Sequence, residues 1–120
     1  MAKAPLQALL FAPTHWSSIL YGKQRVTLRE GTRNYKVGKP VMLCCHIANM
    51  CVMADVVKVT QCKFYNLPFM ELYGLGYRPI TDAEILENLQ QYYPEFSVLS
   101  DVTMIEYANV RGTLIGTNNE

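Results

Sequence analysis

Apolar and polar residues follow regular patterns in the N-terminal part of the chain. Residues 7–12 are mostly apolar and predict a first strand. Pro13 then favours the start of a short helix. The apolar side chains of this helix follow helical spacing: Trp16, Ile19 and Leu20. Gly22 is typical of the position after the last helical turn. Residues 23–29 alternate again and predict a second strand.

The middle of the chain is rich in apolar and β-branched residues. Residues 41–47 and 51–62 predict two strands, which we expect to be joined by a turn around Asn49. Residues 67–79 contain several glycines and prolines, so we expect this stretch to be irregular.

The clearest helix begins after this irregular stretch. Thr81 and Glu84 have the spacing of a capping box, and Pro94 marks the end of the helix. The apolar stripe of the helix is formed by Ile85, Leu86, Leu89 and Tyr92. Residues 96–107 then predict a last long strand, and we expect residues 108–120 to form a C-terminal tail.

These elements predict a single α+β domain over residues 1–107. A chain of 120 residues is long enough for one domain with a hydrophobic core and too short for two. A mixed order of about five to six strands and two helices favours a closed or nearly closed β-barrel over a doubly wound fold, which needs repeated helix crossovers.

Apolar composition argues against a membrane protein. The chain has no run of about 20 apolar residues, which a membrane helix requires. The apolar run over residues 6–12 is short and lacks a small-residue cleavage site after it, so we interpret it as a strand and not a secretory signal. We therefore expect no membrane association and a cytoplasmic location.

Charge is distributed unevenly along the chain, although the net charge is only +1. Residues 1–39 carry seven Lys or Arg and one Glu, whereas residues 79–120 carry one Arg and seven Asp or Glu. A basic segment in a nearly neutral protein favours a local anion site, and the alternative is a solvated basic loop.

The four cysteines do not have the spacing of a metal site or a disulfide framework. Cys44 and Cys45 are adjacent, and no Cys-x-x-Cys pair occurs. His46 beside Cys45 raises the alternative of a metal ligand, but the surrounding apolar run favours small core residues. We expect reduced cysteines, no metal and no cofactor.

The second predicted strand carries the most informative chemistry. Side chains alternate between the two faces of a strand, so Lys23, Arg25, Thr27 and Arg29 are predicted to share one face. A buried face would exclude unpaired charges, so this face is expected to meet solvent or an anionic ligand. Arginine suits phosphate because its planar fork donates two parallel hydrogen bonds. Trp16 could stack on a base or serve as a core anchor.

The same stretch resembles the ASCH (activating signal cointegrator homology) domains. Their signature is an aromatic-containing helix ending in Ile-Leu-x-Gly, then a basic residue and an alternating strand ending in Arg. The matching positions are Ile19, Leu20, Gly22, Val26, Leu28 and Arg29. Residues 35–38 fit the following turn, and the similarity in order extends over residues 6–107. The resemblance implies a PUA-like barrel that contacts RNA or a modified nucleoside, with ligand-binding positions at Arg25, Arg29, Trp16 and Tyr35.

Within this family, Thr27 is similar to the proposed nucleophile of the small bacterial acetylcytidine amidohydrolases. In those enzymes a Lys three residues earlier activates the Thr, and this position holds Gln24, with Lys23 beside it. The resemblance therefore implies Thr27 and Lys23 as candidate catalytic residues. Glu71 and Glu84 are candidates for the downstream acidic residue of those enzymes.

Three functions remain open from the sequence. The first is a domain that binds RNA or a modified nucleoside through the basic strand face. The second is an amidohydrolase that acts on acetylated cytidine. The third is a protein-interaction module with a protein partner, which would use exposed Met and Tyr side chains within residues 69–77.

Overall fold

The computed structural model describes residues 7–45, 50–78 and 81–115. Their central feature is a five-stranded sheet in the order β1-β3-β4-β5-β2. The strands are β1 (Gln7–Phe11), β2 (Val26–Glu30), β3 (Pro40–Cys45), β4 (Met50–Lys63) and β5 (Asp101–Ile115). The helices are α1 (Pro13–Leu20), α2 (Phe69–Gly74) and α3 (Asp82–Tyr92), with a 3₁₀ turn over Phe64–Asn66. Among the strand pairs of these described ranges, only β1 and β3 run parallel.

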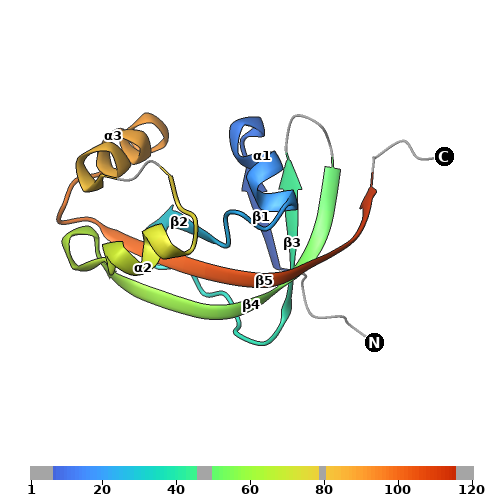
Figure 1. The fold of residues 1–120 in the computed structure, drawn as a ribbon. Coiled ribbons are helices and arrows are strands. Elements are labelled where there is room, and N and C mark those ends of the chain that lie inside the picture. Colours follow the sequence, from blue (N-terminus) through green and yellow to red (C-terminus); the bar gives the residue numbers. More distant parts are fainter. Residues whose placement is uncertain (1–6, 46–49, 79–80, 116–120) are drawn as a thin grey trace.

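The sheet curls into a half-barrel because its two longest strands bend. The pairing of β4 with β5 shifts register between Cys51 and Met53, between Met53 and Asp55, and between Val56 and Lys58. Such irregularities bend a strand and increase its twist. Figure 1 shows β4 and β5 passing along the whole molecule and curving toward β1 and β3 at one end.

Two hydrophobic cores lie on opposite faces of this curved sheet. Along β5, Val102 and Met104 belong to one core, whereas Ile105 and Tyr107 belong to the other, as the alternation of side chains in a strand requires. The helix α1 packs in the core of β1 and β3, and the helices α2 and α3 pack in the core of β2. Each long strand therefore stabilises both halves of the domain.

The structure confirms the predicted α+β fold with a PUA-like, curled sheet, and it corrects two predicted elements. The described residues contain three α-helices where the sequence predicts two, because α2 lies within the stretch predicted to be irregular. A helix of six residues is too short to produce a periodic signal. The last strand begins at Asp101 and continues to Ile115, so the predicted boundary with the tail falls inside β5. The end of the strand predicted over residues 41–47 lies outside the described residues.

The capping box predicted for α3 is confirmed. The backbone N–H of Glu84 donates to Thr81 Oγ1 at 3.2 Å, and the Thr81 hydroxyl donates to Glu84 Oε1 at 2.9 Å. Within the described part of the chain, no helix is long and apolar enough to cross a membrane.

A pair of carboxyl groups joins α2 to the sheet. Lys58 Nζ on β4 lies 3.1 Å from Glu71 Oε2 on α2 and 4.0 Å from Glu106 Oε2 on β5. Burial raises the pKa of Glu106, and its hydrogen bond with Glu71 raises it further. That hydrogen bond, together with Lys58, lowers the pKa of Glu71. Of the two carboxyl groups, Glu106 is therefore the one that binds a proton more readily.

The two carboxyl groups predict that Glu106→Gln and Glu71→Gln change the free energy of unfolding in opposite directions as the pH rises. The folded-state pKa of Glu106 lies above its unfolded value, so its contribution to stability is complete below about pH 4.3 and is lost as the pH rises through the folded-state pKa. Glu106→Gln keeps an N–H donor for Glu71 and has no proton to lose. Its free energy of unfolding should match that of the wild type near pH 4 and exceed it increasingly toward about pH 8, as measured by urea denaturation.

Glu71→Gln is the matched control. The pKa of Glu71 is lowered by folding, so its carboxylate stabilises the protein above the unfolded pKa. This variant should become less stable than the wild type as the pH rises. A Glu106→Gln protein that is no more stable than the wild type at about pH 8 would contradict the assignment of the proton.

Candidate functional site

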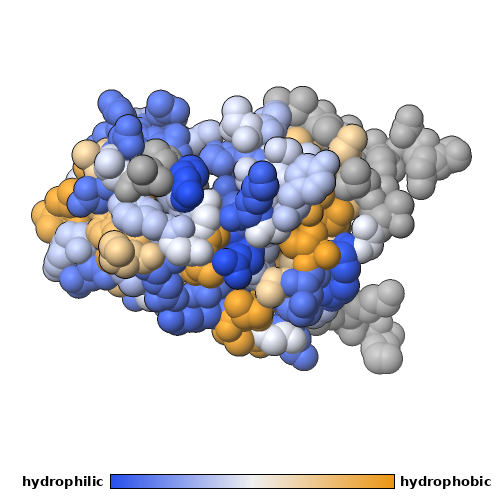
Figure 2. Space-filling model, in the orientation of Figure 1, coloured by the Kyte–Doolittle hydropathy of each residue, from blue (hydrophilic) through white to orange (hydrophobic). Residues whose placement is uncertain are grey.

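A cavity of about 480 Å³ lies where the edge strands β1 and β2 approach each other. The wall consists of β1, the first turn of α1, β2, the segment that follows β2, and the C-terminal half of α3. A hollow between α3 and α1 is visible on the surface in Figure 2. The volume of the cavity lies within the range of small-molecule binding sites, which is roughly 300–1,000 Å³.

Aromatic rings form much of the cavity wall. The aromatic lining residues are Phe11, Tyr35, Tyr77, Tyr92 and Tyr93. Tyr77 is buried, and this burial raises its pKa to about 12, so its hydroxyl stays protonated and can donate a hydrogen bond. Tyr92 is 59% exposed and stands at the mouth of the cavity. The wall thus offers both a buried polar group and an accessible ring face.

A close backbone contact positions Tyr77. Gly76 has a φ of +88°, and a Cβ at this position would lie 1.7 Å from the Lys23 carbonyl oxygen. The preceding residue is fixed as well, because the Arg25 N–H donates to the Leu75 carbonyl at 2.8 Å. Only glycine combines this backbone angle with such a close approach, so the segment after α2 can pass directly beside residues 23–25.

Arg29 connects the two edges of the sheet across the cavity. Its Nη1 donates to Thr27 Oγ1 at 2.7 Å and to the Leu28 carbonyl at 3.1 Å, and its Nη2 donates to the Leu10 carbonyl of β1 at 2.7 Å. The guanidinium carbon also lies 5.1 Å from the centroid of the Phe11 ring. Burial lowers the pKa of Arg29. The ordinary pKa of an arginine side chain is so high that the guanidinium group still remains charged at neutral pH.

The cavity is positively charged and lacks a described counterion. Arg33 lines the same cavity, and its charge adds to the lowering of the Arg29 pKa. Arg33 Nε donates to the Glu30 carbonyl at 2.8 Å, and the Tyr35 hydroxyl donates to the Ala8 carbonyl of β1 at 2.8 Å. Among the described residues that line the cavity, none is Asp, Glu or Lys. Two guanidinium groups therefore face a space that a hydrogen-bond acceptor or anion would complement.

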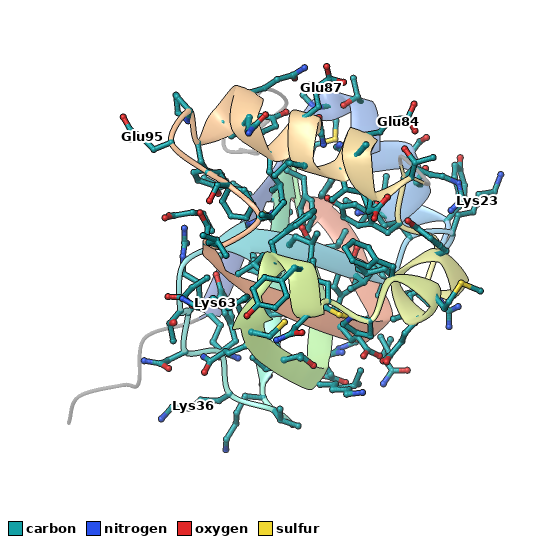
Figure 3. The ribbon with its side chains drawn as sticks, turned by 90° about the vertical axis from the view of Figure 1, so that its left-hand side faces the viewer. Lys23, Lys36, Lys63, Glu84, Glu87 and Glu95 are labelled. Atoms are coloured by element: carbon teal, nitrogen blue, oxygen red, sulfur yellow. The ribbon has the colours of Figure 1, made fainter. Side chains whose placement is uncertain are left out.

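The structure brings together only part of the predicted site. Thr27, Arg29 and Tyr35 line the cavity. The prediction that Lys23 and Arg25 share a strand face with Thr27 and Arg29 is wrong, because β2 begins only at Val26. Both side chains are exposed outside the cavity, and Figure 3 shows Lys23 pointing away from the molecule.

The local backbone explains this difference. The N–H groups of Lys23 and Gln24 both donate to the Ser18 carbonyl at the end of α1, so these residues continue a turn and do not extend the strand. Gln24, predicted on the opposite face, is buried and lines the cavity, where its Nε2 donates to the Val26 carbonyl at 2.9 Å.

Trp16 serves as a core anchor, the second of the two roles that the sequence allows, and not as a stacking surface for a base. It is 8% exposed and packs in the hydrophobic core of β1 and β3. The acidic candidates also lie elsewhere: Glu71 pairs with Lys58, and Glu84 caps α3 on the outside of the molecule (Figure 3). Among the described residues, the cavity therefore contains Thr27 without the lysine or glutamate that the amidohydrolase resemblance implies.

Several cavity residues were missed by sequence reasoning. They are His15, Arg33, Tyr77, Asn88, Tyr92 and Tyr93. The consecutive tyrosines before Pro94 were the available signal, but helical spacing assigned Tyr92 to the apolar stripe of α3. Their position beside β2 depends on how α3 packs against the sheet, which spacing along the chain does not specify.

The metal and redox expectations stay predictions. The four cysteines are not joined by a disulfide, and within residues 7–45, 50–78 and 81–115 no group of three His, Cys, Asp or Glu side chains could hold a metal ion. His46 lies outside these ranges.

The hydrogen bonds of Arg29 predict a specific loss of stability. Arg29→Lys keeps the positive charge, but an ammonium group lacks the planar fork that reaches Thr27 and β1 together. The free energy of unfolding, measured in urea, should fall by about 1–3 kcal/mol. Arg25→Lys is the control, since this exposed side chain has one long contact of 3.4 Å with the Gly74 carbonyl, and a change below about 0.5 kcal/mol is expected. Equal losses in both variants would contradict the bridging role.

Comparison with known proteins identifies the fold through solved structures. No protein-family model and no curated protein matches the chain. The crystal structure of an ASCH protein from Zymomonas mobilis is similar with a TM-score of 0.66 and 13% identity, over 92% of this chain and 73% of that chain.

Two further solved structures have a similar fold. The ASCH domain from Lactobacillus crispatus has a TM-score of 0.67 at 13% identity, over 88% of this chain and 79% of its own. A protein from Enterococcus faecalis has a TM-score of 0.64 at 10% identity, over 94% and 86% of the two chains. The chain has the fold of the ASCH domains.

Proposed function

We propose that the cavity binds a single nucleoside unit, either as a modified nucleoside or as an exposed base of RNA. The observation that carries this proposal is a partly buried Arg29 in an aromatic cavity that has no Asp, Glu or Lys among its described lining residues. Tyrosine rings stack on bases of any sequence, and arginine donates to base acceptors and phosphates. The ASCH resemblance in the sequence supports the same class of ligand.

Different residues supply stacking and edge recognition in this proposal. Tyr92 and Tyr93 are accessible and provide ring faces for the base. The amides of Gln24 and Asn88 provide donors and acceptors that match the edges of a nucleobase. Arg29 supplies a charged donor, because its fork lies in the wall with β1 and β2 on either side.

A pair of tyrosine substitutions tests the proposed stacking. Tyr92→Ala should weaken the binding of acetylcytidine or cytidine by about 5- to 100-fold, which corresponds to one base–aromatic stack. Isothermal titration calorimetry measures the change. Tyr65→Ala is matched, since Tyr65 is 57% exposed against 59% for Tyr92 and lies outside the cavity. No nucleoside binding by the wild type, or equal weakening in both variants, would refute the proposal and favour a protein partner.

The surface expected for that protein partner is partly packed against the core of β2. Of residues 69–77, Met70 is 82% exposed, while Leu72 and Tyr77 are buried in the core of β2. Of the Met and Tyr side chains that the sequence predicts to be exposed there, Met70 is exposed, Tyr73 is half-buried and Tyr77 is buried, which leaves a small area for recognition of a protein.

Hydrolysis of acetylcytidine is expected to be absent or weak. The Thr27 hydroxyl accepts a hydrogen bond from Arg29 and has neither Lys nor carboxylate beside it in the described cavity wall. A positioned general base contributes roughly 10²- to 10⁴-fold to such a reaction. Chromatographic measurement of cytidine release by the wild type and by Thr27→Ala tests this expectation. Robust turnover that disappears in Thr27→Ala would establish the amidohydrolase instead.

A further inference from the structure

Two cysteines face each other across neighbouring strands, away from the cavity. Cys44 on β3 is in direct register with Cys51 on β4. Directly opposed residues of an antiparallel pair have Cα atoms about 4.5–5.5 Å apart, and a disulfide requires about 4.4–6.8 Å. The strand register therefore places the two Cα atoms within the range that a disulfide needs.

The environments of the two thiols differ. Cys44 is 9% exposed, and burial, together with its hydrogen bond to Cys51, raises the pKa of its thiol to about 12. Cys51 is only half-buried, so its sulfur is the one that a solute in water can reach. This arrangement places an accessible thiol next to a protected, protonated one, which is the order required for an attacking and a resolving cysteine.

We propose that Cys44 and Cys51 form a reversible intramolecular disulfide when the protein meets a hydroperoxide. The Cys51 thiolate attacks one oxygen of hydrogen peroxide and forms an S–O bond, which gives a sulfenic acid. The O–O bond breaks, and the hydroxide that leaves takes up the proton that the Cys51 thiol released and becomes the first water molecule. The Cys44 sulfur then attacks the Cys51 sulfur, the S–O bond breaks, and water leaves with the Cys44 proton. Two thiols lose two electrons and two protons, and hydrogen peroxide is reduced to two water molecules.

The cysteine pair lies next to β1, the edge strand to which Arg29 is hydrogen-bonded. Cys44 is in register with Leu10 of β1, and the Leu10 carbonyl accepts the hydrogen bond from Arg29. A disulfide would thus join β3 to β4 beside the strand that forms one edge of the cavity.

Peroxide titration of the reduced full chain tests the proposal. After each dose the protein is unfolded in urea, the remaining thiols are alkylated with N-ethylmaleimide, and peptide mass spectrometry locates the labels. We expect Cys44 and Cys51 to lose their labels together, with a loss of two hydrogens and without added oxygen, and we expect dithiothreitol to restore both. Cys62 is the internal control, because it is half-buried on the same strand and lies opposite Val102 instead of a thiol.

Two variants make the assignment specific. Cys51→Ser should leave Cys44 labelled at every dose that oxidises the wild-type pair, whereas Cys45→Ser should still form the disulfide, since Cys45 is in register with Met50. Persistent labelling of Cys44 and Cys51 in the wild type at doses that oxidise Cys62 would overturn the proposal. A disulfide that involves Cys45, or one that joins two chains, would also overturn it.

Discussion

The guanidinium of Arg29 is the interaction on which the cavity depends. In a closed barrel, backbone hydrogen bonds join the first and last strands, but here the sheet order leaves β1 and β2 as its two edges. Arg29 reaches from β2 to the Leu10 carbonyl of β1, and the Tyr35 hydroxyl reaches the Ala8 carbonyl. Side chains thus connect edges that the backbone does not, and the space between these edges remains available to a ligand.

The hydrogen bonds of Arg29 between β1 and β2 place a positive charge in the wall of the cavity. A buried cation is unfavourable unless hydrogen bonds or an opposite charge compensate for lost hydration. The carbonyls of Leu10 and Leu28 and the hydroxyl of Thr27 supply part of this compensation, while Arg33 adds repulsion from a second positive charge. A ligand rich in acceptor atoms would improve this balance, so the same residue that connects the edges also favours nucleoside or phosphate chemistry.

The remaining structure holds the walls of this cavity at a suitable distance. Register shifts along β4 and β5 curve the sheet, and the two cores on its opposite faces stabilise the curvature. On the side of β2, α2 is joined to β4 and β5 through Glu71, Lys58 and Glu106. The close passage of Gly76 beside the Lys23 carbonyl then directs Tyr77 into the cavity. Substitutions far from Thr27 can therefore alter the site through the position of these elements.

The sequence alone determined the elements whose signals are local. Alternation placed Thr27 and Arg29 on the same strand face, the capping box located the start of α3, and the motif around Gly22 indicated the ASCH fold. These features depend on residues a few positions apart, which share one strand face or one helical turn.

Only the tertiary structure decided which residues accompany Thr27 and Arg29. The Ser18 carbonyl accepts hydrogen bonds from Lys23 and Gln24, so the strand starts later and the lysine lies outside the cavity. The tyrosines at the end of α3 reach the cavity because that helix packs beside β2, and Cys44 meets Cys51 because of strand register. Local periodicity specifies the face of an element, whereas its neighbours depend on long-range packing, which no spacing along the chain encodes.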